Sequence, residues 1–214
     1  YAGNPNVHNY GSSLFGQRFM ARLKTKNYYT ATSVDQLPHH FAALYMYGHP
    51  LLVPVPDIDR TSYFLILGAN PIASNGSMMT APDMRGRMKA VRDRGGKIVT
   101  VDPRRTETAE KSDEHLFIRP GSDAFFLLSL IQVMLDRPAK PSHVFAFTDG
   151  LETIRQVVRD FPPQATASFT GIRAEDAARI AGEFWDAPSA ACYGRIGLST
   201  QKYGGLCQWL IQII

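Results

Sequence analysis

Two apolar runs with a helix-like segment between them constrain the fold of this chain more than any other feature. Residues 63–69 are continuously apolar, and residues 97–101 form a second run rich in β-branched side chains. Runs of this length are typical of strands that are buried on both faces of a parallel sheet. Apolar residues recur at helical spacing within residues 81–94, Pro82 suits the first turn of that helix, and two glycines follow it.

The order strand, helix, strand predicts a βαβ unit. Its right-handed crossover brings the carboxyl ends of both strands to one edge of a parallel sheet, and open sheets of this kind bind ligands at that edge. Polar residues and a glycine follow the two strands there: Gly68, Asn70 and Ser74 after the first, and Asp102, Arg104, Arg105 and Thr106 after the second. We therefore predict an α/β fold with a mostly parallel sheet, flanking helices and a Rossmann-like nucleotide-binding architecture.

The residues after the second strand indicate how a nucleotide would bind. Asp102 can accept hydrogen bonds from ribose hydroxyls, and the guanidinium of Arg104 or Arg105 can pair with phosphate oxygens. The chain contains neither GxGxxG nor GxxxxGK[ST], so neither standard phosphate-binding loop applies. In the alternative interpretation Asp102 only ends a strand and both arginines are solvated, and spacing alone does not decide between the two.

Three strings at residues 65–74, 101–108 and 118–123 resemble segments of the molybdopterin-dependent oxidoreductases, the family of formate dehydrogenases, nitrate reductases and dimethyl sulfoxide reductase. They occur in the family's order, and the resemblance runs from about Asn6 to the last residue. It implies a catalytic subunit that uses bis-molybdopterin guanine dinucleotide with molybdenum or tungsten. Such a subunit acts on a small-molecule substrate by oxygen-atom, hydride or electron transfer and passes electrons to a partner subunit or domain.

The resemblance also implies cofactor contacts in two further loops. Asp123 would meet a guanine edge; the alternative, which can hold at the same time, is that Ser122 or Asp123 caps the apolar helix predicted over residues 124–135. Arg195 would pair with a phosphate, and Gly197 would allow close backbone approach. The cofactor-binding residues predicted in these loops are Gly121, Asp123, Arg195, Gly197 and Thr200.

The loop at residues 28–36 departs from the family pattern. The resemblance places the protein ligand to the metal near this loop and implies cysteine, selenocysteine or serine there, but the loop contains no thiol. We therefore predict no metal ligand, and name Ser33 and a proton-relaying His39 as catalytic candidates. The alternatives are that Ser33 or Asp35 caps the helix predicted over residues 37–47 and that His39 has a packing role.

The pattern along the chain predicts two regions. Residues 1–57 form an N-terminal helical segment that borders the family's substrate funnel, and residues 58–214 form a Rossmann-like dinucleotide-binding region. Hydrophobic periodicity and breaker residues predict the remaining elements. These are an amphipathic helix at 6–23, a helix at 107–114, a third strand at 115–119, a helix at 151–161 stopped by Pro162 and Pro163, a helix at 173–185, a strand at 190–194 and an apolar helix at 206–214.

Composition narrows the functional classes. Hydrophobic residues make up 44% of the chain and charged residues 20%, and no apolar stretch is long enough for a membrane, so we expect no transmembrane segment. The formal charge of +4 is spread along the chain, which argues against a nucleic-acid partner. Cys192 and Cys207 lack metal-binding spacing and are predicted to be buried free thiols.

Both ends of the chain suggest a fragment of a longer protein, since it starts at Tyr1 and ends in an apolar run. The family's cysteines for a 4Fe-4S cluster would lie upstream, so we expect the isolated fragment to be inactive. A cytoplasmic location is preferred, and a periplasmic one stays open because an export signal would also lie upstream. Two other functions stay open: a cofactor-free structural domain of the same fold, and a nucleotide-binding module like the central domain of thiamine-diphosphate enzymes.

Overall fold

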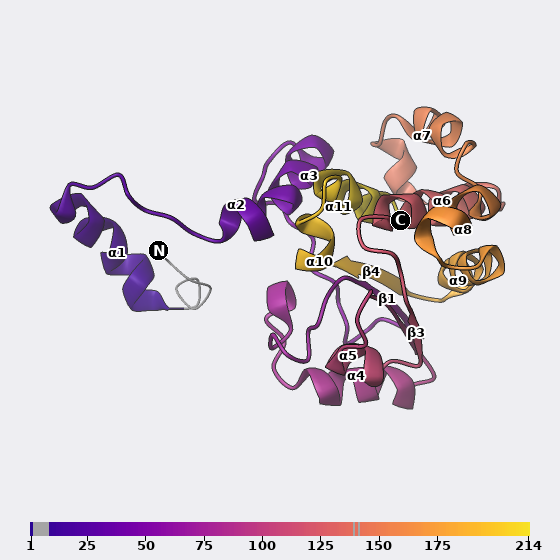
Figure 1. The fold of residues 1–214 in the computed structure, drawn as a ribbon, viewed down its shortest axis with the longest axis horizontal. Helices are drawn as coiled ribbons and strands as arrows, with labels where there is room; N and C mark the ends of the chain where they lie inside the picture. Colours follow the sequence, from indigo (N-terminus) through magenta and orange to yellow (C-terminus); the bar gives the residue numbers. More distant parts are fainter. Residues whose placement is uncertain (2–8, 139, 141) are drawn as a thin grey trace.

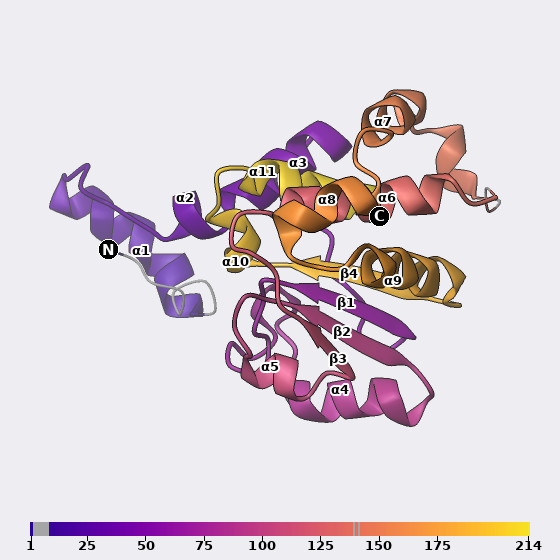
Figure 2. The ribbon, with the colours of Figure 1, turned by 45° about the vertical axis from the view of Figure 1, so that its right-hand side comes forward.

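The computed structural model describes residues 1, 9–138, 140 and 142–214 (Figure 1). They form an α/β structure with a four-stranded sheet in the order β3-β2-β1-β4, and every strand pair in it is parallel. Figure 2 shows helices on both sides of this sheet. The predicted α/β fold with a parallel sheet is therefore confirmed.

The strands are β1 (Tyr63–Leu67), β2 (Lys97–Val101), β3 (Glu114–Leu116) and β4 (Ala190–Gly194). The predictions for β1, β2 and β4 are confirmed. The strand β3 is shorter than predicted, because after Leu116 the chain leaves the sheet and the backbone N–H of Arg119 donates to the carbonyl of Thr170 at 2.8 Å.

The helices occupy most of the remaining chain. They are α1 (Tyr10–Leu23), α2 (Thr32–Asp35), α3 (Leu37–Tyr47), α4 (Met84–Asp93), α5 (Glu107–Glu110), α6 (Asp123–Leu135), α7 (Leu151–Val158), α8 (Pro163–Thr170), α9 (Ala174–Asp186), α10 (Ile196–Ser199) and α11 (Gly204–Ile213). Two short 3-10 helices, η2 (Ser77–Met79) and η3 (His143–Ala146), lie in the connections.

The central strand β1 is buried on both of its faces. Leu65 and Leu67 belong to a core with residues of α6, α9 and α11, whereas Phe64 and Ile66 belong to a second core with residues of α4. Side chains alternate between the two faces because a strand has a two-residue period. Since both faces are covered, the run has to be apolar at every position, which is the feature that identified this strand in the sequence.

Two prolines act differently from the sequence interpretation. The helix α7 ends at Val158, and Pro163 does not stop a helix but starts α8, a first-turn position where its missing N–H has no helical partner to lose. Pro82 lies before α4 rather than in its first turn. The N-cap is Asp83, whose carboxylate accepts a hydrogen bond from the N–H of Gly86 at 3.1 Å.

The predicted helix at residues 107–114 is also partly wrong, since only its first turn, α5, is helical. Glu114 instead joins β3 at the amino end of the sheet. Its carboxylate pairs with the Lys97 ammonium at 3.1 Å and with the guanidinium of Arg179. The ion pairs with Lys97 and Arg179 stabilise Glu114 in the sheet, a position that its helix propensity does not predict.

The predicted amphipathic helix near the N-terminus is confirmed in α1, which extends away from the sheet and its helices (Figure 1). None of its residues is buried, and Leu14, Phe15 and Phe19 are more than 60% exposed. The division at residue 57 stays a prediction. No helix in the described ranges combines the length and the apolar character that crossing a membrane requires.

Both cysteines are free thiols. Cys207 is buried as predicted, while Cys192 is partly exposed. Burial raises the pKa of both thiols, that of Cys207 to about 12, so neither is a thiolate at neutral pH.

Candidate functional site

The strand order defines where a ligand site of this fold lies. The chain runs from β1 outward through β2 and β3 and then returns to place β4 on the other side of β1. The reversal creates a switch point between β1 and β4, and open α/β sheets bind ligands outside the carboxyl ends of the strands at such a point. Gly68, Asp102 and Arg195 directly follow β1, β2 and β4, respectively, so they lie at this carboxyl edge.

Gly68 and Gly197 pack backbone against backbone at the switch point. Gly68 has a φ of 52°, and its carbonyl accepts a hydrogen bond from the N–H of Gly197 at 2.9 Å. A Cβ on Gly197 would lie 2.7 Å from the Gly68 Cα. The close approach expected of Gly197 is therefore made to Gly68 in this structure. The segment around Gly197, which the sequence suggested as a loop, is the helical turn α10.

Asn70 joins the end of β1 to α5. Its Oδ1 accepts a hydrogen bond from the Thr108 hydroxyl at 2.8 Å, and its Nδ2 donates to the Glu107 carboxylate at 2.7 Å. Ser74 is exposed, and its hydroxyl donates to the Asn70 carbonyl at 3.2 Å. These contacts hold the polar loop that follows β1 in place without a ligand.

Asp102 lies at the end of β2 as predicted and is 8% exposed. Its Oδ1 accepts a hydrogen bond from the Arg104 N–H at 2.8 Å, and burial raises the pKa of its carboxyl. Arg104 and Arg105 are exposed, and neither forms a salt bridge within the described part of the chain. Thr106 is buried and caps α5, since its hydroxyl accepts from the N–H of Ala109 at 3.1 Å.

Asp123 is the first residue of α6 and is 2% exposed. Its Oδ2 accepts a hydrogen bond from Nε2 of Gln201 at 2.6 Å. Burial raises the pKa of the Asp123 carboxyl, and the negative charge of Asp102 acts in the same direction. The structure therefore brings the two predicted acids close enough to interact. Gln201 could not be identified from the sequence, because a single polar residue in a turn belongs to no recognisable motif.

The expected side-chain cap at α6 is absent. Ser122 occupies the N-cap position without a capping hydrogen bond, and its hydroxyl instead donates to the carbonyl of Arg119 at 2.7 Å. Gly121 lies just before it, exposed, with a φ of 84°. At the other end of the edge, the exposed Thr200 donates its hydroxyl to the Ile196 carbonyl at 2.8 Å.

Arg195 is buried in an ion pair rather than open to the edge. Its Nη2 lies 2.9 Å from the Asp35 carboxylate, and its Nε donates to the Ser77 hydroxyl at 2.7 Å. Its Nη1 is buried and has no hydrogen-bond partner in the described part of the chain. Asp35 and Ser33 lie inside α2, so the prediction that one of them caps the following helix is wrong. Ser33 is exposed.

His39 is buried beside this ion pair. Its Nε2 lies 3.1 Å from the Gly194 carbonyl, so this nitrogen carries the proton, because a carbonyl can only accept. Burial lowers the pKa of His39 to about 4, and the charge of Arg195 contributes in the same direction. The imidazole is therefore neutral at pH 7 and serves as a hydrogen-bond donor.

The buried His39 predicts a pH-dependent stability. Its pKa is about 4 in the folded protein and 6.5 without burial, so the unfolded chain binds more protons between these values. We expect the free energy of unfolding to fall by roughly 1 kcal/mol per pH unit from about pH 6.5 toward pH 4. Urea unfolding at a series of pH values measures this slope. His39→Gln should lose that component, whereas His49→Gln, at an exposed position, should keep it.

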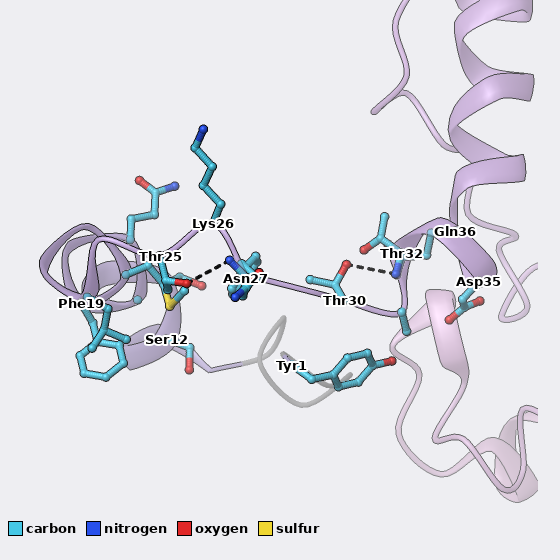
Figure 3. Close-up of a pocket in the computed structure, with 17 residues that line it drawn as sticks. Tyr1, Ser12, Phe19, Thr25, Lys26, Asn27, Thr30, Thr32, Asp35 and Gln36 are labelled. Atoms are coloured by element: carbon cyan, nitrogen blue, oxygen red, sulfur yellow. Dashed lines mark hydrogen bonds between the residues drawn. The ribbon is translucent and has the colours of Figure 1, made fainter.

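A cavity of about 1000 Å³ lies between α1 and the segment that leads into α2 (Figure 3). Its lining includes Phe19, Tyr28, Lys26 and Asp35. The cavity lies within residues 1–57, the segment that is predicted to border a substrate funnel. Ser33 is not among its lining residues, and His39 lines a different cavity of about 250 Å³ beside β4. Within the described ranges, no three His, Cys, Asp or Glu side chains gather as a metal site.

Comparisons with known proteins connect this chain to one family. The family model described as molybdopterin oxidoreductase matches residues 6–152. Formate dehydrogenase H of Escherichia coli (strain K12) is 28% identical over 153 residues, which cover 71% of this chain and 20% of that protein. The thiosulfate reductase molybdopterin-containing subunit PhsA of Salmonella typhimurium (strain LT2) is 30% identical over 172 residues, covering 78% and 20%. This chain thus spans about a fifth of the length of these relatives.

A solved structure shows the same fold. Acetylene hydratase from Pelobacter acetylenicus superposes with a TM-score of 0.73 at 22% sequence identity, covering 96% of this chain and 27% of that one. At this identity the similarity supports the fold alone. The family match excludes the alternative of a module related to thiamine-diphosphate enzymes.

Proposed function

This chain belongs to the molybdopterin oxidoreductase family, and from that premise we propose that it binds a molybdopterin guanine dinucleotide at the carboxyl edge of its sheet. It would do so as part of a longer catalytic subunit with an electron-transfer partner and a small-molecule substrate. The cofactor is a bis-molybdopterin guanine dinucleotide with molybdenum or tungsten, which supplies the oxygen-atom, hydride or electron transfer when bound. A 4Fe-4S cluster would be held by residues outside this chain.

The residues at the edge suit an anionic dinucleotide. Arg104 and Arg105 present two exposed guanidinium groups beside the end of β2, and such groups bind phosphate oxygens in a bidentate manner. Asp123 offers a buried carboxylate that accepts hydrogen bonds. Arg195 fits less well in this arrangement, since Asp35 already neutralises its charge. We therefore assign phosphate binding to Arg104 and Arg105 and a positioning role to Arg195.

The exposed guanidinium groups of Arg104 and Arg105 are the observation on which the proposal depends most, and they lead to a binding prediction. The double variant Arg104→Ala/Arg105→Ala should bind GDP about tenfold more weakly than the wild type, because it loses charge-assisted hydrogen bonds to phosphate. Calorimetric titration measures this change. The control is Arg18→Ala/Arg22→Ala in α1, which removes the same charge from exposed positions away from the edge. An equal loss in both double variants would show only a general charge effect and would contradict the assignment.

The proposal also predicts the metal content of the isolated chain. We expect it to purify without stoichiometric molybdenum or iron and to have no turnover, because the covered part of such a subunit would leave much of a buried cofactor open to water. Elemental analysis by mass spectrometry measures both metals. A molybdenum content near one atom per chain would contradict this expectation.

A further inference from the structure

Gln201 holds the two sides of the carboxyl edge together through one amide group. Its Nε2 lies 2.6 Å from Oδ2 of Asp123 and 2.6 Å from the carbonyl of Gly197. Asp123 begins α6, and Gly197 belongs to α10 beside β4. The amide therefore supplies the buried Asp123 carboxylate with a donor from the protein itself.

The Asp123 carboxylate needs a donor at all times. A buried acceptor that has lost water and has no partner is strongly unfavourable. The amide of Gln201 donates a hydrogen bond to this carboxylate. A base whose edge carries two N–H groups side by side needs both carboxylate oxygens, so it would meet the Gln201 amide at Oδ2.

The three residues of this contact differ in their freedom to move. Gly197 is fixed, since its backbone packs against Gly68 and donates to it at 2.9 Å. Asp123 is fixed as a buried residue at the start of a long helix. Gln201 lies in a turn between α10 and α11, is partly exposed, and precedes the exposed Lys202. The Gln201 side chain is thus the part of the contact that can rotate away without moving a helix.

We infer that Gln201 is an intramolecular competitor of the nucleotide: its amide occupies the Asp123 carboxylate in the free protein and is displaced by a guanine edge. This inference rests on the proposed function. Guanine presents two adjacent donors, N1–H and the exocyclic amine, so it can replace the amide and gain a second bond. Adenine presents an acceptor at the equivalent ring position, so it leaves Gln201 in place. Gln201 therefore sets the affinity for guanine and not the affinity for adenine.

The test is calorimetric titration with GDP and ADP at pH 8, because burial raises the pKa of the Asp123 carboxyl and a high pH favours its ionised form. Gln201→Ala should bind GDP about fivefold more tightly than the wild type and ADP with unchanged affinity, because the competing hydrogen bond is gone. Gln201→Asn, whose amide is one methylene shorter and cannot reach both partners, should behave like the alanine variant. Circular dichroism shows that each variant is folded.

A second readout follows the side chain itself. The Gln201 Nε2 proton signals, assigned by their absence from the Gln201→Ala spectrum, should move toward those of solvated glutamines when GDP is added and stay in place with ADP. If GDP binds the wild type but these signals do not move, or if Gln201→Ala binds GDP more weakly, the competitor role is overturned while the proposed function stands. If neither wild type nor variant binds GDP, both are overturned.

Discussion

Replacing Asp35 by alanine is expected to lower the free energy of unfolding by about 3 kcal/mol. The side chains of Asp35 and Arg195 are only 13% and 7% exposed, and their carboxylate and guanidinium lie 2.9 Å apart. Removal of the carboxylate leaves a buried guanidinium whose positive charge is no longer neutralised. The hydrogen bond from Nε to Ser77 remains, but it does not neutralise the charge. The Asp35→Ala variant therefore carries an uncompensated buried charge.

Urea unfolding of three variants tests this expectation. Asp57→Ala removes the partner of Arg60 in a pair whose side chains are at least half exposed, so it should leave the free energy of unfolding nearly unchanged. Asp35→Ala/Arg195→Met removes both buried charges and should regain most of the stability that Asp35→Ala loses. A loss below about 1 kcal/mol in Asp35→Ala would mean that water reaches the guanidinium and that the pair is not effectively buried.

The central sheet could be predicted because its determinants are local. The residues of β1 and β2 are apolar at nearly every position, which only a strand covered on both faces requires. The right-handed crossover rule then places the ends of both strands at one edge without further information. For this reason the position of Asp102 at that edge was predicted correctly from the sequence.

The partner of Arg195 could not be predicted in the same way. Asp35 is 160 residues away in the chain, and the two meet because α10 packs against α2. In the sequence Asp35 has the pattern of a helix cap, and Arg195 is predicted to pair with a phosphate. Only the tertiary structure determines that Arg195 forms an ion pair with Asp35 while Arg104 stays exposed.

Proline shows a different limit, since one residue type supports two opposite interpretations. Its ring ends a helix from an interior position but suits the first turn of the next helix. Pro163 begins a helix, because Gln164 and Ala165, which follow it, favour helix and because α8 packs against α6. The sequence interpretation considered only the breaker effect and missed this helix.

Replacing Asp123 by asparagine is expected to weaken GDP binding about 100-fold and to abolish a preference for GDP over ADP. A carboxylate accepts two hydrogen bonds side by side, whereas an amide offers one acceptor and one donor. Each hydrogen bond from guanine to the ionised carboxylate contributes about 1.5 to 3 kcal/mol. The substitution removes one of these bonds and places the amide N–H of asparagine, a donor, against a donor of guanine. Because Asp123 is 2% exposed, water cannot compensate for this mismatch.

The control for this substitution is Asp136→Asn at the other end of α6, which makes the same chemical change at its exposed C-cap. It should leave both affinities unchanged in calorimetric titration. Equal affinity of the wild-type chain for GDP and ADP would contradict base reading at this edge altogether. The variant Asp102→Asn distinguishes the role of Asp102 from that of Asp123. If Asp102 contacts the ribose, this variant should lose a similar amount of affinity for GDP and for ADP. If Asp102→Asn alone abolishes the GDP preference, Asp102 reads the base and Asp123 does not.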